Sequence, residues 1–345
     1  RHNWNAGKRS ISLDMKTPQG VAIAKRLVAV SDVVAENFSS RVMPGWGMDY
    51  QSVRNIKPDV IMLSMSGFGR TGPWKDRVSY GQTLQAYSGF TELTGFPYAD
   101  PCGPASAYSD AVGGMAGAQA VLLALLHRAR TGQGQWIDLS QFEALSSLLD
   151  TLVLDLSANG ATSHNLRVGN RSPHSPGSPE GAFPCQGEDR WVAISVLTDG
   201  EWGSLVHVMD NPAWAEEGRF STADARSSHA EELDSLLETW TKQHTAEEIM
   251  RLLQDAGVAA GVVQTGADLA EHDPHIKERG FFRQVLDAQG VSRTIEGAPY
   301  KLSRTPGGAK SGAPAFGADQ TYVLRDVLGM SDEELADCAI AGVFE

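Results

Sequence analysis

Hydrophobic positions in the first half of the chain switch between helical and strand-like spacing. Apolar residues recur every three to four positions after Thr17-Pro18, a threonine N-cap followed by proline at the first helical position, which predicts a helix there. Short apolar runs at 32–35 and 60–63 predict buried strands, and a helix is expected over 50–56 between them. Strand, helix and strand in this order indicate parallel βαβ units and an α/β fold.

A glycine-rich segment, Gly67–Pro73, follows the second predicted strand. Ligands of open α/β sheets bind at the edge formed by the carboxyl ends of the strands, where this segment would lie. It lacks the Lys-Ser/Thr of a P-loop and the spacing of a dinucleotide fingerprint. A turn that needs glycine for positive φ is therefore the first interpretation, and a phosphate-binding loop is the alternative.

Longer segments follow in the same alternation. Helices are expected over 111–130 and 141–158, on either side of a strand at 136–139. The segment 160–181 is rich in Ser, Pro, Gly and Asn and is interpreted as a domain boundary or a functional loop, because structureless loops of this length are uncommon. Beyond it the pattern predicts strands at 191–196 and 258–263 and helices at 199–208, 228–242, 245–256 and 331–341.

Composition narrows the class of protein. The chain has 345 residues, with 29 Lys and Arg against 42 Asp and Glu, and the net charge of −13 argues against a nucleic-acid or anionic-membrane partner. A local basic pocket for a phosphorylated ligand stays compatible with that balance. The longest strongly apolar run, near Val121–Leu126, is too short to span a bilayer. With no visible signal peptide, we expect a cytoplasmic protein.

Metal and hydrolase signatures are weak. The three cysteines, Cys102, Cys185 and Cys338, are far apart and form neither a disulfide framework nor a metal-binding CxxC pair. His272 and His275 are three residues apart, but no nearby pair completes a metal site. No GxSxG elbow occurs, which argues against a serine hydrolase. We therefore predict no metal.

Asp110 is the acidic residue with the clearest chemical potential. It precedes the two glycines Gly113 and Gly114 at the start of the predicted long helix. The simplest interpretation is an N-cap whose carboxylate accepts backbone N–H groups. The alternative is a nucleophile, since the helix dipole would keep the carboxylate ionised and the glycines would leave room for a substrate.

Five short segments, spread along the chain in a fixed order, carry a resemblance to a known family. They are Ala6–Lys16, Glu36–Phe38, Ser64–Pro73, Arg128–Gln135 and Gly257–Val263. Each alone is weak, but together they resemble the family III CoA-transferases, the group that contains formyl-CoA, carnitine and benzylsuccinate CoA-transferases.

The resemblance implies roles for individual residues. Asp110, which follows the Gly103-Pro104 segment, matches the family's catalytic aspartate. In the implied mechanism its carboxylate attacks an acyl-CoA thioester, and an anhydride and then an aspartyl-CoA thioester follow before the acceptor acid attacks. Coenzyme A is thus a substrate, and no permanently bound cofactor is implied. Positions that match the family's CoA contacts are Leu13, Lys16, Asn37, Phe38, Ser39, Arg77 and Tyr80, with Arg41 added as the basic residue closest to the Glu-Asn-Phe segment.

The resemblance also implies the architecture and the assembly. A Rossmann-like large domain that binds CoA is expected over 1–165, completed by 291–345, with a smaller α+β domain over 166–290. Family members form interlocked dimers, so a homodimer is expected and a hetero-oligomer is the alternative. The segment 160–181 would be the family's mobile glycine-rich loop over the site. Because the family begins with several dozen further residues, we interpret the chain as N-terminally truncated.

The implied reaction is CoA transfer from an acyl-CoA to a carboxylic acid. Three runs look closest to the benzylsuccinate branch, which makes succinyl-CoA the expected donor and an aromatic or dicarboxylic acid the expected acceptor; they are Trp46-Gly47, Tyr80–Thr83 and Leu93–Gly95.

Two alternatives stay open at this point. A non-catalytic subunit or truncated pseudoenzyme of a CoA-transferase complex would pair with another chain, although it would not need an intact Asp110. An α-methylacyl-CoA racemase would need a histidine ahead of the aspartate. No histidine lies between His2 and His127, and Tyr80 stands about where it would be.

Overall fold

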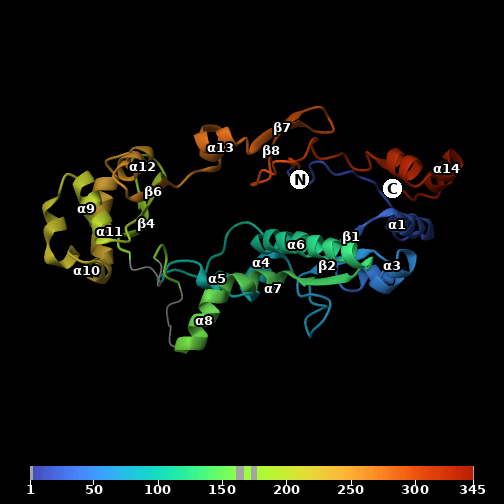
Figure 1. Ribbon diagram of the computed structural model, residues 1–345, viewed down its shortest axis with the longest axis horizontal. Coiled ribbons are helices and arrows are strands. Elements are labelled where there is room, and N and C mark those ends of the chain that lie inside the picture. Colours follow the sequence, from blue (N-terminus) through green and yellow to red (C-terminus); the bar gives the residue numbers. More distant parts are fainter. Residues whose placement is uncertain (1–2, 161–166, 172–176, 345) are drawn as a thin grey trace. The chain divides into compact units, whose positions relative to one another are not determined.

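The computed structural model describes residues 3–160, 167–171 and 177–344. They belong to two compact units (Figure 1). Unit 1 comprises residues 1–93, 102–162 and 274–345, and unit 2 comprises residues 94–101 and 163–273. Unit 1 contains a parallel sheet with helices, so the predicted α/β class is confirmed.

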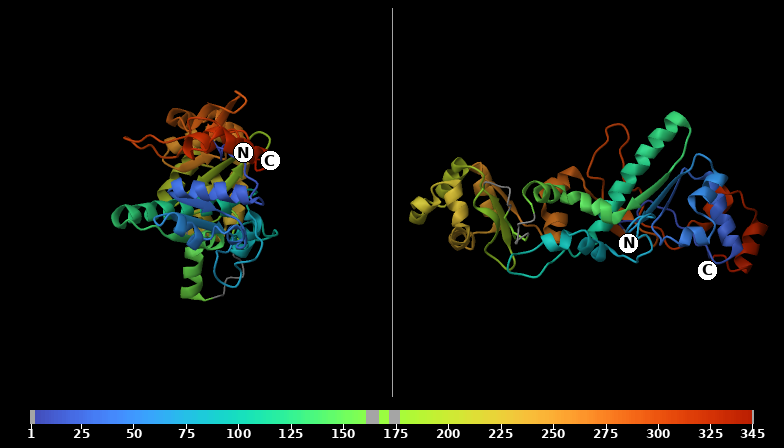
Figure 2. Two further views of the ribbon diagram at one scale, coloured as in Figure 1. Left: turned by 90° about the vertical axis from the view of Figure 1, so that its right-hand side faces the viewer. Right: turned by 90° about the horizontal axis from the view of Figure 1, so that it is seen from below.

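The sheet of unit 1 has three parallel strands in the order β1 (Val33–Glu36), β2 (Ile61–Ser66) and β3 (Trp136–Ser140). Parallel neighbours need crossover connections, and the chain supplies α3 (Tyr50–Ile56) between β1 and β2, and α6 (Tyr108–Thr131) between β2 and β3. α6 lies along one face of the sheet, as both figures of the ribbon show (Figure 1, Figure 2). The carboxyl ends of all three strands therefore meet at one edge.

Helix α1 (Pro18–Val30) begins as its sequence predicts. The Thr17 hydroxyl accepts the N–H of Gly20 at 3.0 Å, and Pro18 occupies the first helical position. The remaining elements of unit 1 are α2 (Val42–Gly45), α4 (Gly81–Tyr87), α5 (Phe90–Leu93), α7 (Gln141–Ser146), the 3-10 helix η1 (Ser147–Leu149), α8 (Asp150–Asn159), α13 (Pro274–Arg279), the antiparallel pair β7 (Phe282–Leu286) and β8 (Ser292–Glu296), the π-helix η5 (Tyr322–Val327) and α14 (Asp332–Ile340). The single helix predicted over 141–158 is thus divided by η1.

Helix α6 begins three residues earlier than predicted, and the N-cap interpretation of Asp110 is wrong. Ala107 is the N-cap, and Asp110 lies inside the first turn. A side chain from another helix replaces the local cap, because Gln85 of α4 accepts the N–H of Tyr108 at 2.9 Å. The buried Ser109 hydroxyl also donates to the carbonyl of Gly81 at 3.2 Å. Packing between α4 and α6 therefore sets where α6 starts.

By length and composition alone, α6 is long and apolar enough to cross a membrane. Core helices of globular proteins pass the same test, so this property assigns no membrane span. Several apolar side chains of α6 are at least half exposed in the single chain and form what we call the α6 stripe: Met115, Leu122, Leu123 and Leu126.

Unit 2 is built on an antiparallel sheet in the order β4 (Glu180–Pro184), β5 (Trp191–Ser195) and β6 (Ala259–Val262). Its other elements are α9 (Asp199–Val208), the 3-10 helices η2 (Ala213–Glu216) and η3 (Gly218–Phe220), α10 (Ala223–Ser228), α11 (Ala230–Thr241), α12 (Ala246–Asp255) and the π-helix η4 (Asp268–His272). Apolar faces of sheet and helices form one core, in which Val192, Leu205, Phe220, Leu237 and Leu253 are completely buried.

Arg226 of α10 is a buried cation that forms hydrogen bonds and an ion pair with neighbouring segments of unit 2. Its Nε donates to the carbonyl of Ser178 at 2.7 Å, its Nη1 donates to the carbonyl of Phe220 at 3.1 Å, and its Nη2 pairs with Asp199 at 2.8 Å. We expect Arg226→Met to lower the free energy of unfolding by about 3 kcal/mol, because methionine fills much of the volume but leaves two buried carbonyls without donors. Urea denaturation of the purified protein measures this loss.

Arg251→Met is the matched control, since Arg251 pairs with Asp255 on an exposed helix face. Exposed pairs of this kind contribute about 0.5 kcal/mol or less. Equal and small losses for both variants would show that Arg226 does not hold the unit together.

Candidate active site

A cavity of about 340 Å³ lies in unit 1 at the edge where the strands end. This is the edge at which open parallel sheets bind their ligands. The turn after β1, the loop after β2, the segment ahead of α4, the first turn of α6 and the start of α7 supply its walls. The lining residues are Asn37, Phe38, Ser39, Ser66, Gly67, Phe68, Lys75, Arg77, Val78, Ser79, Tyr80, Gly81, Leu84, Asp110 and Gln141.

Six of the nine residues that the sequence singled out line this cavity. They come from three separate parts of the chain, and the parallel sheet brings them together because the ends of its strands are neighbours. The six are Asn37, Phe38, Ser39, Arg77, Tyr80 and Asp110.

The structure places the other three elsewhere, so as CoA contacts they stay predictions. Leu13 packs against the apolar cluster around Ile23 and Leu324. The exposed Lys16 lies at a turn in which its N–H donates to Asp14 at 2.9 Å. Arg41 is the residue before α2 and lines a second, larger cavity beside the first.

Asp110 is partly buried, and burial raises the pKa of its carboxyl. No group in the described part of the chain donates a hydrogen bond to this carboxylate. This loss of surrounding water acts against the helix end that was predicted to keep the carboxylate ionised, and ionisation of Asp110 at neutral pH stays a prediction. A carboxylate free of hydrogen bonds has all its lone pairs available for attack on an electrophile.

This raised pKa has a kinetic consequence. We expect any activity that needs ionised Asp110 to be present at neutral pH and to be lost as the pH falls through a pKa above the ordinary value of about 4. The acid limb of kcat/KM plotted against pH measures it in the free enzyme. An acid limb at or below the ordinary aspartate value would contradict this assignment.

The two glycines after Asp110 differ in what surrounds them. A Cβ at Gly113 would lie 2.9 Å from Cγ of Gln141, so this glycine allows α7 to pack against α6. A Cβ at Gly114 would meet no heavy atom of the described chain within 4 Å. The predicted open space beside Asp110 is therefore found at Gly114 and not at Gly113.

The cavity is locally basic although the chain carries a net charge of −13. Lys75 and Arg77 line it, and Asp110 is the carboxylate among its lining residues. The guanidinium of Arg77 lies 4.7 Å from the ring centre of Trp74. Sequence reasoning found Arg77 but missed Lys75, two positions earlier in the same basic segment. A pocket of this charge suits a phosphorylated ligand.

Sequence reasoning also missed Ser66 and Gln141. Ser66 ends β2, and its buried Oγ has no hydrogen-bond partner among the described residues. Buried hydroxyls are nearly always paired, so a ligand in the cavity is a natural partner for this one. The glycine-rich segment that begins at Gly67 was visible in the sequence, but nothing there showed that the preceding hydroxyl would be buried and unpaired.

Two further predictions concern the glycine-rich loop and a metal site. Residues 161–166 and 172–176 of the predicted glycine-rich loop lie outside it, so a role of this loop over the site stays a prediction. Among the described residues, no three His, Cys, Asp or Glu side chains are grouped to hold a metal ion.

Known proteins are similar to this chain in sequence and in fold. The model of CoA-transferase family III matches residues 2–320. A succinyl-CoA–D-citramalate CoA-transferase from Chloroflexus aurantiacus is 32% identical over 329 residues, which cover 95% of this chain and 80% of that protein. The β subunit of succinyl-CoA–L-malate CoA-transferase from the same organism is 32% identical, with 96% and 81% covered.

A solved structure agrees with the sequence comparisons. The crystal structure of a CaiB/BaiF family protein from Brucella suis matches with a TM-score of 0.87 and 33% identity, covering 95% of this chain and 83% of that one. The predicted family and enzyme class are confirmed, and the chain belongs to CoA-transferase family III.

Proposed function

We propose that this protein transfers CoA from succinyl-CoA to a dicarboxylic acid, with Asp110 as the nucleophile. The observation that carries the proposal is the single cavity that unites Asp110, the cations Lys75 and Arg77, and the turn of residues 37–39. The names of the two sequence relatives support the choice of substrates, since both pair succinyl-CoA with a hydroxylated dicarboxylic acid.

Coenzyme A would bind through its phosphates and its adenine. Lys75 and Arg77 supply the positive charge for the phosphates. Phe38 is 45% exposed and packs edge-on against Trp46, so its ring is held in place with one side free to support the adenine. The Ser66 hydroxyl is free to hydrogen bond to an atom of the bound thioester.

The proposed reaction proceeds through two anhydrides and one enzyme-bound thioester. The Asp110 carboxylate attacks the thioester carbonyl of succinyl-CoA, which forms a succinyl-aspartyl anhydride and releases the CoA thiolate. The thiolate attacks the aspartyl carbonyl, so succinate leaves and an aspartyl-CoA thioester forms. The acceptor carboxylate then attacks this thioester and releases the thiolate again. Attack of the thiolate on the acceptor's acyl group gives the new acyl-CoA and regenerates the Asp110 carboxylate.

We also propose that two copies of the chain associate, in the interlocked manner implied by the family resemblance. The α6 stripe supports this proposal, because several large exposed apolar side chains on one helix are typical of an interaction surface. The relative that is named as a β subunit keeps a hetero-oligomer as the alternative. Light scattering on the purified chain should give the mass of a dimer, and a monomer that dimerises only with a second gene product would favour the alternative.

The function is tested by supplying succinyl-CoA together with one acid at a time and following all CoA esters by mass spectrometry. The panel contains malate, citramalate, glutarate, an aromatic acid and a monocarboxylic acid. We expect a new acyl-CoA and an equal amount of succinate with at least one dicarboxylic acid. Hydrolysis of succinyl-CoA without transfer to any acid would refute the proposal, and so would epimerisation of a 2-methylacyl-CoA with no transfer.

A further inference from the structure

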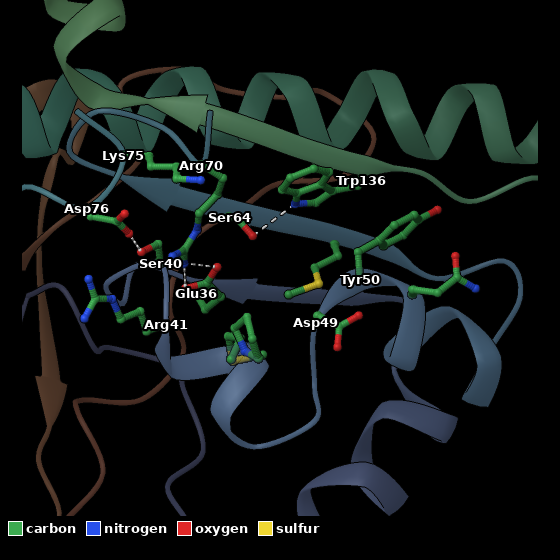
Figure 3. Close-up of a pocket in the computed structure, with 14 residues that line it drawn as sticks. Glu36, Ser40, Arg41, Asp49, Tyr50, Ser64, Arg70, Lys75, Asp76 and Trp136 are labelled. Atoms are coloured by element: carbon green, nitrogen blue, oxygen red, sulfur yellow. Dashed lines mark hydrogen bonds and ion pairs between the residues drawn. The ribbon is translucent and has the colours of Figure 1, made fainter. Parts of the chain in front are cut away.

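A buried ion pair lies beside the proposed active site without lining it. Glu36, the last residue of β1, and Arg70, in the loop after β2, have side chains that are only 3% and 9% exposed. Nη2 of Arg70 lies 2.6 Å from both carboxylate oxygens of Glu36 (Figure 3). Both residues line the neighbouring cavity of about 640 Å³ and not the one that holds Asp110.

Arg70 follows β2 in the chain and contacts the two strands on either side of it, β1 and β3. Its backbone N–H donates to Oδ1 of Asp138 on β3 at 2.7 Å, while its side chain holds Glu36 on β1. Glu36 and Asp138 both neighbour Ser64 of β2 in the register of the sheet. We call Glu36, Arg70 and Asp138 the strand-end clamp.

The backbone N–H of Phe38 links the strand-end clamp to the active-site cavity. Oε2 of Glu36 accepts the N–H of Phe38 at 2.9 Å. Phe38 lies at the middle of the 37–39 turn, all of which lines the cavity. The position of this turn therefore depends on the Glu36 carboxylate, and the position of that carboxylate depends on Arg70.

We propose that Arg70 is a positioning residue for coenzyme A, which acts through Glu36 to hold the 37–39 turn in the shape that receives the CoA moiety. This inference rests on the proposed function of the cavity. It assigns a task to the glycine-rich segment Gly67–Pro73 other than direct phosphate binding. In this proposal Arg70 acts on the backbone of the residues that receive CoA and does not contact CoA itself.

The energetics of the Glu36–Arg70 pair favour a positioning role over a purely stabilising one. A well-packed apolar pair of similar volume often stabilises a protein as much as a buried ion pair does, or more. Nη1 of Arg70 is also buried without a hydrogen-bond partner among the described residues, which adds a desolvation cost. The ion pair supplies a fixed hydrogen-bond acceptor for the Phe38 N–H. An apolar pair cannot supply one.

The test replaces both charges at once, because Arg70→Ala alone would strand a buried carboxylate and unfold part of the sheet. In the double variant Glu36→Leu with Arg70→Met, we expect a melting temperature close to that of the wild type. We expect its Kd for free CoA, measured by calorimetry, to rise roughly tenfold or more because the turn loses its acceptor. The KM for succinyl-CoA should rise in step, while kcat and the KM for the acceptor acid should change by less than about twofold.

Arg128→Met is the matched control. Arg128 pairs with Asp32, just ahead of the other end of β1, at 2.8 Å, and neither residue lines the cavity. This variant should lose stability and keep the wild-type Kd for CoA. Arg70→Lys keeps the charge at the clamp and should fold normally, with a Kd between those of the wild type and the double variant.

Two results would overturn the inference. One is a folded double variant with wild-type Kd and KM, which would make the pair purely structural. The other, decisive if the double variant does not fold, is an Arg70→Lys protein with unchanged Kd and KM. A wild-type protein that binds CoA but transfers none would refute the proposed function and leave the Kd comparison valid, whereas one that binds no CoA would refute both.

Discussion

Asp110→Ala is expected to abolish CoA transfer, with a loss of roughly 10⁴-fold or more in kcat, while the protein still folds and binds CoA. Every step of the proposed reaction makes or breaks a bond to the Asp110 carboxylate, so no neighbouring group can replace it. Asp110 is also the carboxylate among the residues that line the cavity. Mass spectrometry of the acyl-CoA products measures the loss of transfer. Calorimetry with CoA measures the retained binding.

A chemical trap makes the same prediction specific for the residue. Hydroxylamine added with succinyl-CoA should convert an activated Asp110 into its hydroxamate, which peptide mass spectrometry locates. Asp224→Ala is the control, because Asp224 is an exposed aspartate in the first turn of a helix, α10, in unit 2. It should keep full activity and the trapped adduct. A hydroxamate that persists in the Asp110→Ala protein would place the nucleophile elsewhere.

The raised pKa of Asp110 also predicts how a substitution at this position changes the stability of the protein. Burial favours the protonated carboxyl in the folded protein, so the ionised form costs stability at neutral pH. Asp110→Asn should therefore raise the melting temperature at neutral pH. The gain should shrink as the pH falls through the raised pKa and vanish below the ordinary aspartate value, where both states are protonated. A variant that is less stable than the wild type at neutral pH would contradict a desolvated Asp110.

Local signals predicted those elements whose ends are determined by neighbouring residues in the sequence. Thr17 and Pro18 begin α1 as expected, since the cap and the helix are adjacent. The start of α6 was missed because its capping group, Gln85, comes from another helix and is visible only after folding. The pair β7 and β8 was also missed, since its strands are short and largely exposed and carry little periodic signal.

In the candidate active site, too, sequence motifs predicted some features and tertiary contacts determine the others. Motifs at the ends of parallel strands could be expected to converge, and Asn37, Phe38 and Asp110 do line one cavity. The direction of the pKa shift at Asp110 could not be predicted, because it depends on how much water packing removes. The free hydroxyl of Ser66 and the link from Arg70 to Phe38 through Glu36 are likewise properties of tertiary contacts that span the sheet.

The contact between α4 and the start of α6 leads to the second large effect that we expect. Gly81 is the first residue of α4, and a Cβ there would lie 2.9 Å from Cα of Ala107, the N-cap of α6. The Gly81 carbonyl also accepts the hydroxyl of Ser109, the residue before Asp110. Any side chain at position 81 must therefore push apart the two segments that hold the nucleophile in the cavity.

Gly81→Ala should consequently lower the free energy of unfolding by about 1–3 kcal/mol through overpacking. It should also lower kcat by up to roughly 10²-fold, because displacing a reacting group by about 1 Å has effects of that size. Thermal denaturation and transfer kinetics with succinyl-CoA measure both. Gly203→Ala in α9 is the control, since its Cβ would meet no described heavy atom within 4 Å, and it should gain up to about 1 kcal/mol from helix propensity. Wild-type activity in Gly81→Ala would show that the α4–α6 contact does not position Asp110.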